Sequence, residues 1–183
     1  MKSARALVLF APGFEEIETI TIIDVLRRAG VDVTAAGTAE GVLEGSHGIR
    51  VEVDCAMAGL KASDYDAVIL PGGMQNATTL AEHADAQRLL REAKGSQRTI
   101  GAICAAPIAL EAAGLLRGRT VTSHPSVEAQ LNPSSYRTDR VVRDGDLITS
   151  RGPGTALEFA LEVAAGLVGA ERAGALAGPM LAR

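Results

Sequence analysis

Residues 99–107 read Thr-Ile-Gly-Ala-Ile-Cys-Ala-Ala-Pro, and the organisation of the chain can be worked out from this stretch. The apolar residues before Cys104 predict a buried strand. Pro107 suits the first turn of a helix, where the N–H that proline lacks would have no partner. Cys104 is therefore expected on a sharp strand-to-helix turn at the edge of a sheet.

A cysteine on such a turn has two possible roles. The N–H groups and the positive dipole end of the following helix favour thiolate over thiol, and from a usual pKa of about 8.5 a modest decrease makes thiolate the main form at neutral pH. Alternatively, the side chain is a small buried hydrophobe. The neighbours Gly101, Ala102, Ala105 and Ala106 are all small, as a crowded nucleophile turn requires, and this favours the reactive role.

Apolar runs like that before Cys104 recur along the chain between longer amphipathic stretches. The predicted strands cover residues 6–10, 31–36, 67–70, 99–104 and 120–123. The predicted helices cover residues 15–28, 84–94 and 107–113 and end at Gly30, Gly95 and Gly114. Strands that are apolar throughout and alternate with helices predict an α/β fold, in which helices cover both faces of a largely parallel sheet.

Two further elements are predicted near the C-terminal end. Residues 140–150 form a hairpin that turns at Asp144-Gly145. A last helix begins at Thr155, and Glu158 three residues later would complete a capping box with it. No linker or repeat divides the chain, so residues 1–183 are expected to form a single domain.

Composition excludes several classes of protein. The chain is 47% hydrophobic and 22% charged with a net charge of −4, which gives no reason to expect specific nucleic-acid binding or a membrane surface. The first apolar run, about six residues, is too short for a signal peptide or a membrane span, so a cytoplasmic location is expected. Two cysteines, at positions 55 and 104, make no disulfide framework. Metal, nucleotide and nicotinamide motifs are absent, so no metal or cofactor is expected.

In α/β sheets, ligands bind at the carboxyl ends of the strands, and notable residues follow three other predicted strands. Glu15, Glu16 and Glu18 lie in the first turn of an apolar helix; at least one should face inward, where burial would raise its pKa and allow it to carry protons. Spacing does not choose among the three, and dipole partners are the simpler explanation for each. After residues 67–70 comes Pro-Gly-Gly-Met, residues 71–74, which makes either a plain turn or a loop whose N–H groups bind an oxyanion.

The histidines and the second cysteine carry weaker signals. His124 follows the strand predicted at 120–123; a lone histidine is more often structural, but at this edge it could act as a base or a hydrogen-bond donor to the thiol. His83 lies in a polar stretch and is expected to be solvated. Cys55 has no small-residue turn around it and is expected to be structural.

Taken together, these blocks resemble the ThiJ/PfpI superfamily and, within it, the parkinsonism-associated deglycase branch. The resemblance is carried, in order, by residues 5–8, 13–18, 24–30, 70–73, 102–107, 122–125 and 149–155. The blocks extend over nearly the whole chain, and their combination is specific although each alone is weak.

The resemblance implies a flavodoxin-like three-layer sandwich, commonly a homodimer. It implies that Cys104 is the nucleophile with Glu18 as the acid bonded to it, that His124 lines the pocket, and that the N–H groups of Gly73 and Ala105 form the oxyanion hole. Substrate-pocket residues implied by the resemblance are Gly72 and Met74, with Arg28 and Pro179 approaching from the partner subunit.

This chain departs from the superfamily at two places. Ala105 follows the nucleophile where peptidase members carry histidine, and Ser126 follows His124-Pro125 where related glutaminases carry glutamate. A Cys-His-acid triad cannot be assembled from these motifs, which argues against amide hydrolysis. His47 stands where animal members often have arginine, so a role in holding an anion there is left open.

Two main hypotheses and a weaker one follow. The first is a glutathione-independent glyoxalase or deglycase, without cofactor, in which Cys104 adds to methylglyoxal, glyoxal or their early adducts on proteins and lactate or glycolate is released. The second is an oxidative-stress sensor or chaperone in which Cys104 is oxidised to a sulfinic acid. The weaker hypothesis is a PfpI-type cysteine peptidase.

Overall fold

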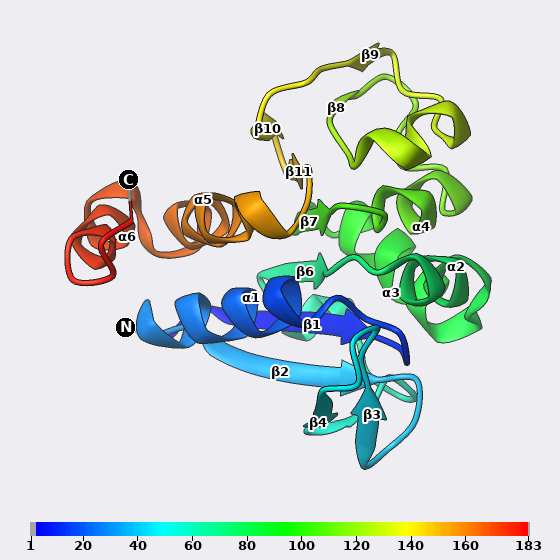
Figure 1. Cartoon of the computed structure of the whole chain (residues 1–183), viewed down its shortest axis with the longest axis horizontal. Helices are drawn as coiled ribbons and strands as arrows, with labels where there is room; N and C mark the ends of the chain where they lie inside the picture. The colour runs from blue at the N-terminus through cyan, green and yellow to red at the C-terminus, as the bar shows by residue number, and fades with distance from the viewer. Residues whose placement is uncertain (1–2, 183) are drawn as a thin grey trace.

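A computed structural model describes residues 3–182, and its centre is a seven-stranded sheet in the order β10-β11-β7-β6-β1-β2-β5 (Figure 1). The strands are β1 (Arg5–Phe10), β2 (Asp32–Gly37), β5 (Cys55–Ala56), β6 (Ala67–Leu70), β7 (Thr99–Ile103), β10 (Val141–Asp144) and β11 (Leu147–Ser150). All neighbours pair in parallel except the hairpin of β10 and β11.

Two apolar layers cover the sheet, and β1 shows how one strand supplies both. Ala6, Val8 and Phe10 point to one face, whereas Leu7 and Leu9 point to the other, because successive side chains of a strand alternate. On the first face lie α1 (Glu16–Arg28), α5 (Ala156–Val168) and α6 (Ala170–Ala177). On the second lie α3 (Ala84–Gly95), α4 (Pro107–Ala112) and part of α2 (Met74–Glu82). The predicted three-layer, flavodoxin-like α/β fold is confirmed.

Small elements extend from the sheet. An antiparallel hairpin joins β3 (Val42–Glu44) to β4 (Arg50–Glu52), and β8 (Thr120–Val121) pairs in parallel with β9 (Ser135–Tyr136). Three short 3₁₀ helices cover Ala62–Asp64, Pro125–Gln130 and Pro153–Thr155. Within residues 3–182, no helix has the length and apolar character needed to cross a membrane.

One predicted strand does not lie in the central sheet. Residues 120–123 were expected in the sheet, but only Thr120 and Val121 are extended, and they pair with β9 outside it. The N–H of Thr122 is donated to the side-chain oxygen of Thr149 on β11, 2.9 Å away. The place beside β7 is taken by β11, the second strand of the predicted hairpin, a pairing between distant segments that local sequence does not reveal.

The predicted capping box at the start of α5 is also wrong. Thr155 precedes the helix, but its hydroxyl accepts the N–H of Gly152 (3.1 Å) and lies 2.6 Å from the Ser150 hydroxyl. The Glu158 carboxylate instead receives the Arg140 guanidinium at 2.9 Å. The two side chains therefore connect α5 to the hairpin rather than capping each other. Helices α2 and α6 were not predicted.

Candidate active site

Cys104 lies directly after β7, where the chain turns towards α4. Its φ of +64° is in the left-handed region, which non-glycine residues rarely adopt and which is often found at functional sites. The surrounding backbone holds this conformation: the Cys104 N–H is donated to the Ser150 carbonyl at the end of β11 (3.0 Å), and the Cys104 carbonyl accepts the His124 N–H (2.9 Å). The predicted sharp turn is present, and the thiol is half-buried.

Two backbone N–H groups point at the Cys104 sulfur. One belongs to Ala105, the next residue, and the other to Gly73, which precedes α2. Gly73 has a φ of +94° and is packed against the carbonyl of Gly13 without room for a side chain. A negative charge on this sulfur, or on an oxygen next to it, would have both donors available.

Glu18 is the acid that faces the thiol. It comes from the first turn of α1, has no exposed surface, and contacts the Cys104 thiol. Its Oε2 accepts the Gly72 N–H at 2.6 Å, while its buried Oε1 has no hydrogen-bond partner among the residues described. A Cβ atom at Gly72 would lie 2.5 Å from the Cys104 Cβ and 2.6 Å from Glu18 Oε2. Glycine is therefore required for the acid and the thiol to meet.

All three acids of this turn are buried, and each does something different. Glu15 caps α1 by accepting the Glu18 N–H at 2.8 Å. Glu16 faces away from the thiol and holds the β3–β4 hairpin through the His47 N–H (2.5 Å), the His47 ring (2.9 Å) and the Ser46 hydroxyl (3.1 Å). Only Glu18 contacts Cys104.

Burial dominates the protonation of the Cys104–Glu18 pair. It raises the pKa of Glu18 to about 8, helped by the charge of Glu15 and opposed by the Gly72 N–H and the thiol. It also raises the pKa of Cys104 to about 12, helped by the charge and hydrogen bond of Glu18 and opposed by the N–H groups of Gly73 and Ala105. The expected decrease of the thiol pKa is therefore wrong, because the helix-end argument neglected desolvation and a neighbouring carboxylate. As a coupled pair, the two groups lose a first proton near pH 8 and hold a single negative charge up to about pH 12.

In the pair of Glu16 and His47, hydrogen bonds affect the pKa of the carboxyl group more than burial does. Burial alone raises the pKa of Glu16, but hydrogen bonds from His47 and Ser46 outweigh it and lower that pKa to about 2. The hydrogen bond to Glu16 and its charge raise the pKa of His47. Glu15, Glu16 and His47 place one potential metal ligand each within 4.8 Å of one another. Capping and hairpin contacts already account for these acids.

The other predicted site residues differ in how they lie relative to Cys104. Met74 begins α2 beside Gly73 and is exposed. The Nδ1 atom of the His124 ring lies 2.7 Å from the Ser126 hydroxyl, and the backbone N–H of His124 donates to the Cys104 carbonyl. Arg28 pairs with Asp24 on its own helix at 2.7 Å, and Pro179 is exposed near the end of the described chain. Within residues 3–182, neither of these two contacts Cys104.

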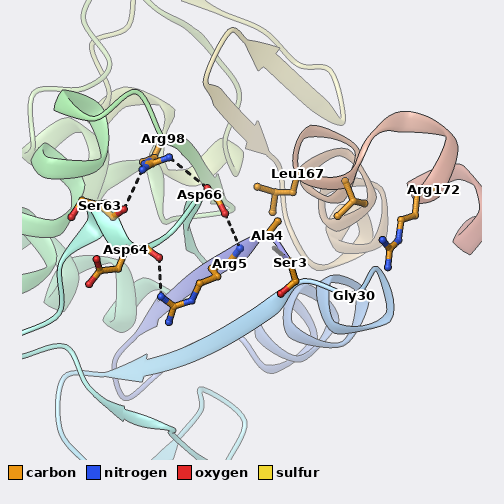
Figure 2. Close-up of a pocket in the computed structure, with 11 residues that line it drawn as sticks. Ser3, Ala4, Arg5, Gly30, Ser63, Asp64, Asp66, Arg98, Leu167 and Arg172 are labelled. Atoms are coloured by element: carbon orange, nitrogen blue, oxygen red, sulfur yellow. Dashed lines mark hydrogen bonds and ion pairs between the residues drawn. The ribbon is translucent and has the colours of Figure 1, made fainter. Parts of the chain in front are cut away.

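A cavity of about 790 Å³ lies elsewhere, at the amino ends of the strands (Figure 2). Arg5 begins β1, and Asp66 and Arg98 directly precede β6 and β7, whereas Cys104 follows the carboxyl end of β7. The Asp66 carboxylate accepts the Arg5 N–H at 2.9 Å and pairs with Arg98 at 3.5 Å. Asp66 thus connects Arg5 and Arg98 within this cavity, whereas Cys104 lies at the opposite edge of the sheet.

Sequence reasoning missed one buried polar residue beside the site, Asn76. It lies in α2, which was not predicted, and its fully buried amide bonds to the loop that carries Gly72 and Gly73. An asparagine three residues after a Gly-Gly pair gives no local signal of such a role. Helix α2 itself would have had to be predicted first.

Comparison with known proteins identifies the family of this chain. The model of the DJ-1/PfpI family matches residues 4–166. The chain belongs to the DJ-1/PfpI family. The crystal structure of DJ-1beta from Drosophila melanogaster is similar with a TM-score of 0.95 and 44% identity, covering 100% of both chains.

Two other DJ-1/PfpI relatives bear on function. "Glutathione-independent glyoxalase DJR-1.2" of Caenorhabditis elegans is 39% identical over 178 residues, which are 96% of this chain and 95% of that protein. The structure "Toxoplasma gondii DJ-1, oxidized" is similar with a TM-score of 0.93 and 33% identity over 98% of both chains.

The raised pKa of Glu18 predicts how stability depends on pH. Between its usual value of 4.5 and about 8, the folded protein holds a proton on Glu18 that the unfolded chain has released, so stability falls as the pH rises through this window. Glu18→Gln removes this penalty and should be about 1–3 kcal/mol more stable at pH 7.5. Urea unfolding at pH 5 and pH 7.5 measures the effect. A wild-type stability that rises over the same range would contradict the assignment.

Proposed function

We propose that this protein is a glutathione-independent glyoxalase that converts methylglyoxal or glyoxal into lactate or glycolate, and that it also accepts their early adducts on proteins. One observation carries the proposal: the Cys104 sulfur receives two backbone N–H groups while a fully buried carboxyl group contacts it. The relative named as a glutathione-independent glyoxalase supports the same chemistry.

At rest, the first negative charge of the pair lies on Glu18, which has the lower pKa. In the reactive form, the proton of the thiol has moved to Glu18 and the charge is on sulfur. Two N–H groups, from Gly73 and Ala105, stabilise the sulfur, whereas one N–H, from Gly72, reaches the carboxyl group. The sulfur is also half-exposed while Glu18 is fully buried, so a charge on sulfur loses less hydration. With Glu18 neutral, its O–H is a donor to the thiolate rather than a repelling charge.

The reaction begins when the thiolate adds to the aldehyde carbon of methylglyoxal. The carbonyl π electrons move to oxygen, and Glu18 gives its proton to this alkoxide to form a hemithioacetal. The oxygen that becomes negative is stabilised by the Gly73 and Ala105 N–H groups. Glu18 is then an ionised carboxylate in a buried site, which makes it a strong base.

The remaining steps move one proton between the two substrate carbons. Glu18 removes the hydrogen from the former aldehyde carbon to give an enediolate whose negative oxygen is on the neighbouring carbon. The hydroxyl proton of the former aldehyde carbon passes to that oxygen, and Glu18 returns its proton to the neighbouring carbon, which yields a thioester on Cys104. With Glu18 as base, water adds to the thioester, and lactic acid leaves as the thiolate is restored. Lactic acid releases its proton to solvent, so the net reaction is methylglyoxal plus water to lactate plus a proton.

Peptide hydrolysis is disfavoured by the same geometry. A cysteine peptidase needs an imidazole that takes the thiol proton and passes it to the leaving amine. The His124 ring bonds to Ser126 instead, and the group that contacts the thiol is a carboxyl.

Lactate production tests the proposal. Cys104→Ser should reduce the turnover of methylglyoxal without glutathione by at least about a thousandfold, since loss of a covalent nucleophile has effects of this order or larger. Cys55→Ser is the matched control: Cys55 lies at the sheet edge in β5, and its removal should leave turnover within about twofold. Lactate formation by Cys104→Ser at the wild-type rate would show the mechanism to be wrong.

A second function, oxidant sensing, is favoured by a different property of the site. The half-buried sulfur remains accessible, and a protonated Glu18 could donate to the oxygens of a sulfinic acid on Cys104. Mild peroxide should then add two oxygen atoms at Cys104, where Glu18 and the N–H groups of Gly73 and Ala105 can stabilise the oxidised sulfur. Cys55 should stay unmodified, because its charged neighbours are the acids Asp54 and Glu40, which disfavour a negative sulfur. Peptide mass spectrometry locates the adduct, and modification of Cys55 alone would count against sensing.

We also propose a homodimer in the cytoplasm. Ile17 and Ile20 on α1 are 58% and 45% exposed, and Val42 and Ile49 of the β3–β4 segment are 51% and 55% exposed. The Glu16–His47 contact holds this hairpin next to the start of α1, so these side chains form one apolar surface, of the kind that marks an interface. The partner subunit's Arg28 and the partner subunit's Pro179 would then approach Cys104, as the family resemblance implies.

Sedimentation velocity tests the dimer. Ile20→Glu places a charge in the apolar surface and should convert a dimer of about 38 kDa into a monomer of 18.9 kDa. Lys61→Glu changes the charge at another exposed position outside that surface and should leave the dimer intact. A wild-type protein that sediments as a monomer would overturn the proposal.

A further inference from the structure

Asn76 makes three hydrogen bonds from a position with no exposed surface. Its Oδ1 accepts the N–H of Ala11, just beyond β1, at 2.6 Å. Its Nδ2 donates to the carbonyls of Pro71 at 2.8 Å and Gly72 at 3.0 Å. The orientation of the amide is determined by these partners, because a reversed amide would place N–H against N–H and oxygen against two carbonyls.

The two carbonyls belong to consecutive peptide groups that also supply the site. A trans peptide is planar, with its C=O and N–H pointing in opposite directions. The Pro71 carbonyl shares a peptide with the Gly72 N–H, which donates to Glu18. The Gly72 carbonyl shares the next peptide with the Gly73 N–H, which donates to the Cys104 sulfur. One side-chain nitrogen therefore holds two peptides from behind while their N–H groups face the reacting pair.

We propose that Asn76 is the positioning residue for this active site: by binding both carbonyls it aims the Gly72 N–H at Glu18 and the Gly73 N–H at Cys104. The inference deepens the proposed function, since it identifies what orients the oxyanion donor. The Pro-Gly-Gly segment needs such support. Neither glycine has a side chain to restrict its backbone, and glycine is the most conformationally permissive residue.

The contacts around the Gly72 carbonyl show how much depends on Asn76. The Glu15 N–H also donates to this carbonyl at 3.0 Å, so the second peptide keeps one donor without Asn76. The Pro71 carbonyl has Asn76 as its side-chain donor. Donation to a carbonyl also polarises the peptide and strengthens its N–H as a donor. Loss of Asn76 should therefore weaken both donors to the pair even where the fold survives.

The test is Asn76→Ala in a Cys55→Ser background, so that one thiol remains. Thiolate absorbance against pH gives the pKa at which negative charge appears on sulfur, and methylglyoxal kinetics separate kcat from KM. We expect this pKa to rise by about half a unit or more and kcat to fall about 10- to 100-fold, somewhat less than for outright loss of an oxyanion donor. KM should change less than about threefold, since the donors act on developing charge.

Thr78→Ala is the matched control. Thr78 lies on the same helix, is exposed, and bonds only to the Met74 carbonyl in its own turn, so its removal should leave the pKa and kcat within error of wild type. A merely structural role for Asn76 predicts reduced thermal stability with unchanged thiolate pKa and unchanged kcat in the folded fraction. That pattern would overturn the proposal.

Two further measurements keep the proposal testable. If Asn76→Ala does not fold, hydrogen exchange on the wild type decides: the Asn76 side-chain amide and the Gly72 and Gly73 N–H groups should be protected together, and solvent-rate exchange of the Asn76 amide would refute the role. If the wild type does not turn over methylglyoxal, the glyoxalase proposal fails. The thiolate pKa would still report on Asn76 alone.

Discussion

A thiol and a carboxyl group in contact, away from water, can hold only one negative charge between them, and the rest of the site depends on this constraint. Glu18 has no exposed surface, and the pKa values of both groups are raised. Backbone N–H groups can stabilise the charge on either atom, since two face the sulfur and one faces the carboxyl. The same pair can give a proton to an alkoxide and then remove one from carbon.

The fold brings these groups together at one edge of the sheet. Glu18 follows β1, Gly72 and Gly73 follow β6, and Cys104 follows β7, next to the end of β11, whose Ser150 carbonyl fixes the Cys104 backbone. Because these strands are parallel, their carboxyl ends meet at that edge. The left-handed backbone of Cys104 is held by β11 on one side and by His124 on the other.

Much of this arrangement could be predicted from local sequence, and the failures have physical causes. Apolar runs predict the strands because buried strands need apolar side chains, and small residues predict the turn at Cys104 because a crowded turn has no room for larger ones. Spacing did not select Glu18 among three acids, since the choice depends on Glu16 being held by the distant His47. The helix-end argument gave the wrong pKa direction for Cys104 because it lacked the carboxyl partner. Local sequence indicates neither that β11 pairs with β7 nor that Asn76 binds the loop of Gly72 and Gly73.

The central claim is that the pair gains one negative charge near pH 8, that this charge lies on Glu18, the group with the lower pKa, and that the thiol keeps its proton until it reacts. Infrared spectra of the protonated carboxyl C=O band and thiolate absorbance, recorded on one sample through pH 6–10, test it directly, with Glu18→Gln to assign the band. The account predicts that the Glu18 carboxyl band is lost near pH 8 while no thiolate absorbance appears over the same range, because burial and Glu18 raise the pKa of Cys104 to about 12. A rise of thiolate absorbance near pH 8 with the carboxyl band unchanged would place the charge on sulfur and contradict the account.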